Sequence, residues 1–182
     1  MTEKQIVRFD MFEMEYRGGP LTSELPVIPF DPKYYGKYKF LINSCYYEMR
    51  RDLHIKPYGE FCDSLEELMS KKENIFLLMD GDEIICAVSC VENEISGVAV
   101  NLQYQRQGYG RKIVEFAISF LQQQGNSPIK LTVTKWNQNA VALYKSLGFE
   151  TTKETTVEGA NTKDSNGNWT FVFTSTGGLS VS

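Results

Sequence analysis

The segment that decides the fold reads Gln105-Arg106-Gln107-Gly108-Tyr109-Gly110, and Arg111-Lys112 follow it directly. A hydrophobic run that ends at Val100 precedes the segment, and an amphipathic pattern follows it. The order is therefore strand, glycine-bearing turn, helix. Backbone N–H groups of such a turn point to one place without partners, and glycine lets a phosphate approach the backbone closely. We therefore expect an anion site at residues 105–111.

The kind of anion site can be narrowed by exclusion. A P-loop needs Gly-x-x-x-x-Gly-Lys-Ser/Thr, which is absent. A dinucleotide fingerprint needs a third glycine three positions after Gly110, where this chain has Ile113. The remaining pattern is Gln-x-x-Gly-x-Gly, and taken alone it is also compatible with an ordinary strand–helix turn.

A second pattern follows within residues 131–149. Residues 131–134 (Leu-Thr-Val-Thr) are β-branched and alternating, which favours a strand after the breaker Pro128. Asn137 or Asn139 is a natural helix N-cap, and Gly148 is a C-terminal helix signal. The positions between them that share one helical face are Ala140, Leu143, Tyr144 and Leu147.

Together these two patterns resemble the GCN5-related N-acetyltransferase (GNAT) superfamily over about residues 75–150. The first resembles its acyl-CoA pyrophosphate loop. The second resembles Asn-x-x-Ala-x-x-Leu-Tyr-x-x-x-Gly-Phe and matches without gaps from Asn137 to Phe149. The resemblance implies an α/β (α+β) fold with a mixed, mostly antiparallel central sheet flanked by helices. It also implies that the strand before the loop splays from its neighbour.

The resemblance further implies a binding site for acetyl-CoA as co-substrate, with no metal. The backbones of Val98 and Val100 are the candidates for the pantetheine arm, and the N–H groups of Gln107 to Arg111 for the pyrophosphate. Arg106, Arg111 and Lys112 are candidates to pair with phosphates. Asn137 is expected to bond the cofactor as well as cap its helix. The full set of expected cofactor-binding residues is Val98, Val100, Gln105, Arg106, Gln107, Gly108, Tyr109, Gly110, Arg111 and Asn137.

Two residues are the candidates for proton transfer. Tyr144 matches the tyrosine that many members use to protonate the departing thiolate. Glu94 precedes Gln105 by eleven residues, the offset of the catalytic glutamate in the histone-acetylating branch. A carboxylate with its ordinary pKa is a poor base for an amine, so Glu94 would need burial. The alternative for Tyr144 is a purely structural role on the apolar face of its helix. The alternative for Glu94 is an ordinary exposed glutamate beside a turn, without a catalytic role.

Length, charge and cysteine spacing limit the kinds of protein that this chain can be. The length of 182 residues suits one domain spanning residues 1–182, and the net charge of −4 argues against nonspecific binding to nucleic acid. The negative net charge is compatible with a cationic amine as the acceptor. We expect no membrane span and no signal peptide, and the spacing of Cys45, Cys62, Cys86 and Cys90 suggests reduced thiols in a cytoplasmic protein.

Hydrophobic periodicity and turn signals place the remaining elements. Expected strands cover residues 4–16, 75–79, 83–91, 94–100, 150–158 and 168–174, and expected helices cover 33–53, 65–72 and 111–124, with residues 17–32 irregular and 177–182 a frayed tail. The leading hypothesis is an N-acetyltransferase that moves acetyl from acetyl-CoA to a primary amine by direct attack. The alternatives are an acyl-CoA-binding sensor without turnover and transfer of a longer acyl group. The acceptor, a small molecule or a peptide, stays open, as does a homodimer.

Overall fold

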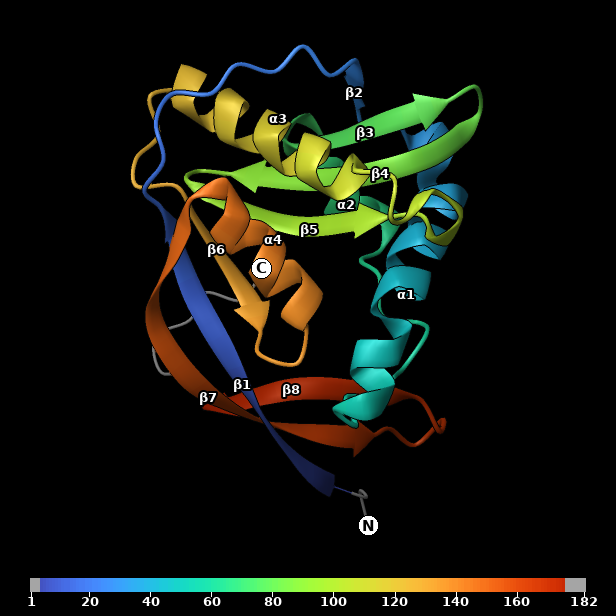
Figure 1. The fold of residues 1–182 in the computed structure, drawn as a ribbon. Coiled ribbons are helices and arrows are strands. Elements are labelled where there is room, and N and C mark those ends of the chain that lie inside the picture. Colours follow the sequence, from blue (N-terminus) through green and yellow to red (C-terminus); the bar gives the residue numbers. More distant parts are fainter. Residues whose placement is uncertain (1–3, 176–182) are drawn as a thin grey trace.

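The computed structural model describes residues 4–175, which form one mixed sheet with helices on both faces (Figure 1). The strands are β1 (Lys4–Tyr16), β2 (Val27–Pro29), β3 (Ile75–Asp80), β4 (Glu83–Val91), β5 (Glu94–Val100), β6 (Lys130–Thr134), β7 (Phe149–Lys163) and β8 (Trp169–Ser175). Their spatial order is β2-β3-β4-β5-β6-β1-β7-β8. Every pairing is antiparallel except that of β5 with β6.

The helices divide between the two faces of the sheet (Figure 1). The α-helices are α1 (Tyr35–Asp52), α2 (Leu65–Ser70), α3 (Tyr109–Gln123) and α4 (Gln138–Leu147), and the short 3₁₀ turns are η1 (Pro32–Tyr34), η2 (Lys72–Asn74) and η3 (Leu102–Tyr104). Helices α3 and α4 pack their apolar faces into the larger core, whereas α1 and α2 cover the smaller one. Among the described residues, no helix is long and apolar enough to cross a membrane.

Local sequence signals explain where the helices begin and end. Ser64 and Glu67 form the expected capping box of α2. The N-cap of α4 is Asn137, whose side chain accepts from the Ala140 N–H at 3.1 Å, and Gly148 ends the helix with a φ of 104°. These caps confirm the reading of both segments from the sequence.

The feature that positions the site is a wedge between β5 and β6. These parallel strands pair only at Glu94 with Lys130 and Ile95 with Leu131. Beyond these pairs they diverge, so the later residues of β5 have no strand partner on that side. The expected splayed strand in a mostly antiparallel sheet is therefore confirmed.

Two strands differ from the sequence-based expectation. Strand β2 lies inside the segment expected to be irregular; it is three residues long, and Pro29 is tolerated because β2 is at the sheet edge. Strand β7 continues five residues past the expected end, through Gly159, a residue that disfavours strands. The Phe171 ring covers this glycine so closely that an added Cβ would lie 2.1 Å from it. The expected frayed tail, residues 177–182, lies outside the described residues.

Asn161 of β7 ties the end of α1 to the sheet. Its side chain is 0% exposed, its Nδ2 donates to the His54 carbonyl at 2.7 Å, and its Oδ1 accepts from the Lys56 N–H at 2.8 Å. His54 follows α1 with a φ of 57°, so the chain turns sharply there. The amide therefore satisfies two backbone groups in a turn that fixes one wall of the site.

We expect Asn161→Leu to lower the free energy of unfolding by about 3 kcal/mol, because it leaves a carbonyl and an N–H without partners. Urea-induced unfolding measures this change. Asn166→Leu, in the exposed β7–β8 turn, is the control and should change stability little. If Asn161→Leu lowered the free energy of unfolding no more than the control does, the Asn161 side chain would not be what stabilises this turn.

Candidate active site

The wedge between β5 and β6 opens into a cavity of about 730 Å³. Helix α1 forms one wall, the segment from β5 to the start of α3 forms another, and the segment from β6 into α4 closes it. Residues predicted to bind the cofactor or to catalyse that line this cavity are Val98, Val100, Gln105, Arg106, Tyr109, Gly110, Asn137 and Tyr144. Patterns more than thirty residues apart in sequence thus meet at one place.

The glycine turn presents free backbone donors to this space. Helix α3 begins at Tyr109, two residues before the expected start, and its N-cap is Gly108 with a φ of 87°. The first intrahelical bond is that of the Lys112 N–H to the Gly108 carbonyl. Within residues 4–175, the N–H groups of Tyr109, Gly110 and Arg111 have no acceptor. Unpaired donors at the positive end of a helix dipole suit an anion.

Gly110 lets this helix start approach its neighbours. A Cβ there would lie 3.4 Å from Leu143 of α4 and 3.8 Å from Val100 of β5. The Arg111 guanidinium donates to Ser146 at 2.6 Å and pairs with Glu115 at 3.6 Å, so it is already engaged on α3 and α4. Arg106 is exposed at the cavity rim with a φ of 61° and has no recorded ion pair among the described residues.

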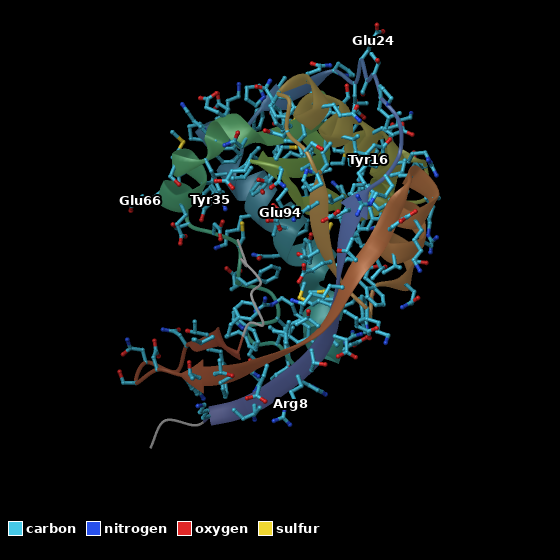
Figure 2. All side chains as sticks on the ribbon, turned by 90° about the vertical axis from the view of Figure 1, so that its left-hand side faces the viewer. Arg8, Tyr16, Glu24, Tyr35, Glu66 and Glu94 are labelled. Carbon is cyan, nitrogen blue, oxygen red and sulfur yellow. The ribbon has the colours of Figure 1, made fainter. Side chains whose placement is uncertain are left out.

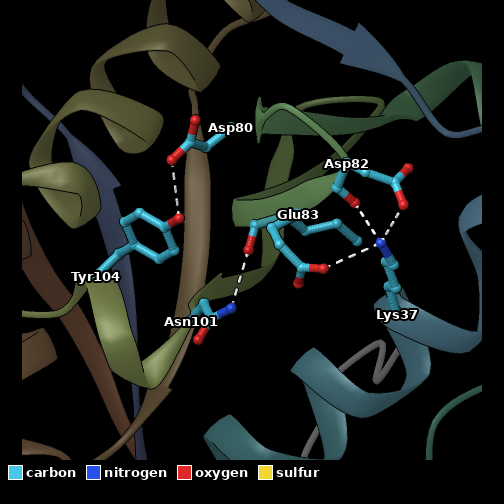
Figure 3. A network of polar contacts seen from close by, with 7 residues as sticks. Lys37, Asp80, Asp82, Glu83, Asn101 and Tyr104 are labelled. Atoms are coloured by element: carbon cyan, nitrogen blue, oxygen red, sulfur yellow. Dashed lines mark hydrogen bonds and ion pairs between the residues drawn. The ribbon is translucent and has the colours of Figure 1, made fainter.

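A polar network holds the turn after β5 (Figure 3). The Asn101 Nδ2 donates to the Ile84 carbonyl of β4 at 3.2 Å, and its Oδ1 accepts from the Gln103 N–H. The Tyr104 hydroxyl donates to Asp80 of β3 at 3.0 Å. These bonds anchor η3 to the β3–β4 hairpin, which itself contacts α1 through Lys37. The segment that leads into the glycine turn is therefore fixed to β3 and β4.

The carbonyls of Val98 and Val100 face the wedge. The Asn101 N–H donates to the Ile85 carbonyl of β4. Because successive residues of a strand direct their backbone groups to opposite sides, the N–H and carbonyl groups of Val98 and Val100 point away from β4. There the Val98 carbonyl accepts from the Tyr46 hydroxyl at 3.1 Å, and the Val100 carbonyl accepts from the Cys45 thiol at 3.1 Å. The Gln105 side chain also donates to Val100. Side chains of α1 thus hold the free edge of β5.

Tyr144 lies where the two halves of the site meet. Its side chain is 7% exposed, packs edge-on against Phe149, and lines the cavity. No hydrogen bond of its hydroxyl is recorded within residues 4–175. Burial raises the pKa of Tyr144 to about 12, so the hydroxyl stays protonated at neutral pH. The Tyr144 hydroxyl is therefore a neutral hydrogen-bond donor that has no protein acceptor among the described residues.

Glu94, labelled in Figure 2, does not line the cavity. It starts β5, beside the closed end of the wedge, and is not among the cavity-lining residues. At the usual rise along a strand it is about 13 Å from Val98. Burial and the neighbouring Glu92 raise its pKa, which Lys130 partly opposes. The direction of the shift suits a base, but the structure does not bring Glu94 together with Tyr144.

Asn137 lines the cavity and uses its Oδ1 to cap α4, which leaves its Nδ2 available as a donor. Gln107 and Gly108 are exposed beside the cavity without being part of its lining. Within residues 4–175, no group of His, Cys, Asp or Glu is arranged to hold a metal ion.

The sequence suggested that Tyr34, Tyr35, Tyr38, Tyr46 and Tyr47 could line an aromatic acceptor groove, with core packing as the alternative. Of these, Tyr46 lines the cavity from α1, whereas Tyr38 is buried in the smaller core. Cys45, Tyr46, Glu48 and Trp136 all line the cavity, yet none lies in a motif that assigns it a role. Burial raises the pKa of Cys45 to about 11, so this thiol is protonated at neutral pH.

Comparisons with known proteins agree with this geometry. Residues 41–149 match the model of the acetyltransferase (GNAT) family. The [ribosomal protein bS18]-alanine N-acetyltransferase of Escherichia coli strain K12 is 33% identical over 108 residues, which cover 57% of this chain and 71% of the relative.

Solved structures show the same fold at low identity. A putative GNAT-family acetyltransferase from Novosphingobium aromaticivorans superposes with a TM-score of 0.64 at 16% identity, covering 86% of this chain and 66% of the other. An acetyltransferase of the GNAT family from Colwellia psychrerythraea gives 0.63 at 11% identity, covering 87% and 56%. About a third or more of each of these longer chains thus has no counterpart here. With both motifs meeting at one wedge and the family model spanning residues 41–149, the chain belongs to the acetyltransferase (GNAT) family.

Proposed function

We propose that this protein is an N-acetyltransferase that moves the acetyl group of acetyl-CoA to a primary amine by direct attack. The observation that carries the proposal is that Tyr109 and Gly110, whose N–H groups are unpaired, line the same cavity as Tyr144, whose hydroxyl has no partner among the described residues. The first suits the anionic end of the donor. The second suits the sulfur from which the acetyl group departs.

The residues present fit acetyl-CoA. Free N–H groups at the start of α3 would hold the pyrophosphate with Arg106 beside it, and the wedge-facing backbone of Val98 and Val100 would hold the pantetheine amides. The Asn137 Nδ2 is a further donor at the rim. Bound there, the donor supplies an activated acetyl group as a thioester.

Tyr144 would act through its Oη–H. With a pKa of about 12 against about 8.5 for a thiol, complete proton transfer to the sulfur is uphill by about 5 kcal/mol. We therefore assign Tyr144 the donation of a hydrogen bond that stabilises the departing thiolate, with solvent completing the protonation. The buried setting strengthens such a bond.

Direct attack fits the state of the cavity thiol. Cys45 is the cavity's cysteine among the described lining residues, and its raised pKa and its bond to the Val100 carbonyl leave it a poor nucleophile. An amine that enters beside Tyr144 would thus attack the thioester itself rather than a covalent acyl-enzyme.

The test is to incubate the protein with acetyl-CoA and an amine library, and to record free CoA and acetylated products by mass spectrometry. Acetylated amine with stoichiometric CoA supports the proposal. Tight acetyl-CoA binding without any CoA release would indicate a sensor, and turnover only with a longer acyl-CoA would correct the donor.

Glu94 is proposed as the base that accepts the ammonium proton through solvent. We expect Glu94→Gln to lower kcat/KM about tenfold at pH 7, and to matter less at pH 9, where more amine is already neutral. The raised pKa of Glu94 favours proton acceptance once the pH exceeds it, so the wild-type advantage should persist through neutral pH. A pH profile of both proteins measures this; equal profiles would assign deprotonation to solvent alone.

A further inference from the structure

Helix α1 crosses the open wedge from one strand to the other. At its middle, Cys45 and Tyr46 bond the carbonyls of β5. One turn later the Met49 sulfur accepts from the Thr134 hydroxyl at the end of β6, at 3.4 Å. Glu48 precedes Met49 and lines the cavity. Glu48 is exposed, so its carboxylate lies where the cavity meets solvent.

The cavity has a distinct distribution of charge. Among its described lining residues, Glu48 is the single acidic side chain and Arg106 the single basic one. Arg106 stands with the free N–H groups of the glycine turn, so that part of the cavity is positive. Glu48 has no recorded ion pair within residues 4–175. Arg51, whose pKa Glu48 helps to raise, instead bonds Asp52 at 2.9 Å.

An aromatic ring without a cation over it lines the same cavity. Trp136 follows the end of β6 by two residues, is 40% exposed, and lines the cavity. The second tryptophan, Trp169, has the Lys56 and Lys163 ammonium groups over its ring at 3.9 and 5.4 Å. No such cation is recorded over Trp136 within the described residues. A carboxylate and an indole face that line one cavity are the groups that bind an organic cation.

We propose that Glu48 and Trp136 bind a second cationic group of the acceptor, so that the preferred acceptors are amines with another positive charge, such as diamines. This inference rests on the proposed function and names its substrate class. The cation held there differs from the reacting amine, because pairing with a carboxylate favours the protonated form and would suppress attack. The buried Tyr144 and the exposed Glu48 provide separate places for the two amines.

Binding can be tested without acetyl-CoA. The chain has two tryptophans, so the indole N–H signals in a ¹⁵N NMR spectrum are two, and Trp136→Phe identifies its own. Titration with 1,4-diaminobutane should shift the Trp136 signal saturably, whereas 1,4-butanediol should not. Glu48→Gln should raise the dissociation constant about fivefold or more. Glu24→Gln, an exposed glutamate at the far edge of the molecule (Figure 2), should leave it unchanged.

Turnover gives a second readout. In wild type, kcat/KM for 1,4-diaminobutane should exceed that for butylamine, and Glu48→Gln should bring the two values together without changing KM for acetyl-CoA. No saturable shift of Trp136, or the same dissociation constant in Glu48→Gln, would overturn the cation site. A normal titration with no CoA release from any amine would refute the proposed function while leaving the cation site intact.

Discussion

Replacing Tyr144 by phenylalanine is expected to lower kcat about a hundredfold or more, the usual cost of losing one hydrogen-bond donor to charge that develops in the transition state. The dissociation constant of acetyl-CoA should stay within about twofold, because the anion-binding groups on α3 are untouched. The change removes one oxygen and keeps the ring that packs on Phe149, so the core should be preserved. Steady-state kinetics and calorimetric binding of acetyl-CoA separate the two effects.

The matched control is Tyr104→Phe. Tyr104 also lines the cavity, but its hydroxyl is directed to Asp80. The Asn101 bonds still hold the turn after β5 when this hydroxyl is removed, so kcat should change little. Wild-type kcat should also show no alkaline decline up to pH 10, because Tyr144 with a pKa of about 12 remains protonated there. Undiminished turnover in Tyr144→Phe would assign the ring a packing role only.

Gly108→Leu is expected to weaken acetyl-CoA binding at least tenfold, a loss of about 1.4 kcal/mol or more. A Cβ at Gly108 would meet no protein atom within 4 Å, so the new side chain would not disturb the core. It would instead extend into the space in front of the free N–H groups of α3, which a pyrophosphate needs. Calorimetric titration of the variant with acetyl-CoA measures the loss.

The control must reproduce the backbone strain that a side chain incurs at positive φ, about 1–2 kcal/mol. Gly125→Leu does so: Gly125 has a φ of 75°, no atom within 4 Å of an added Cβ, and lies at the other end of α3. Both variants should lose similar stability, and only Gly108→Leu should lose affinity. Equal affinities would place the phosphates elsewhere.

The sequence was sufficient to predict helices whose boundaries are set by neighbouring residues. The capping box at Ser64, the N-cap at Asn137 and the stripe that follows it each depend on neighbouring residues, and each is where it was expected. Strand β2 and the end of β7 were missed because both depend on distant partners. Val27–Pro29 is a strand through its pairing with β3, and Gly159 is tolerated in β7 because Phe171 covers it.

The candidate site divides in the same way. Its donor side lies in two contiguous motifs, so the residues from Gln105 to Gly110 and the pair Asn137 and Tyr144 could be named in advance. Its proposed acceptor side lies within residues 44–49 of α1, which follow the buried residues of that helix, and only packing decides which part of α1 faces the wedge. Glu94 shows the limit of spacing alone, since its offset from Gln105 gave no information about which end of β5 borders the cavity.

The wedge also has a mechanical consequence. It divides the sheet into two four-stranded leaves, β2-β3-β4-β5 and β6-β1-β7-β8, which share main-chain pairing at two register positions. Cohesion between the leaves therefore depends on side chains of α3 and α4 that pack against both. Hydrophobic cohesion weakens on cooling, whereas the hydrogen-bonded leaves keep their own ladders. We therefore expect the two leaves to separate between β5 and β6, in the middle of the sheet, when the protein unfolds at low temperature.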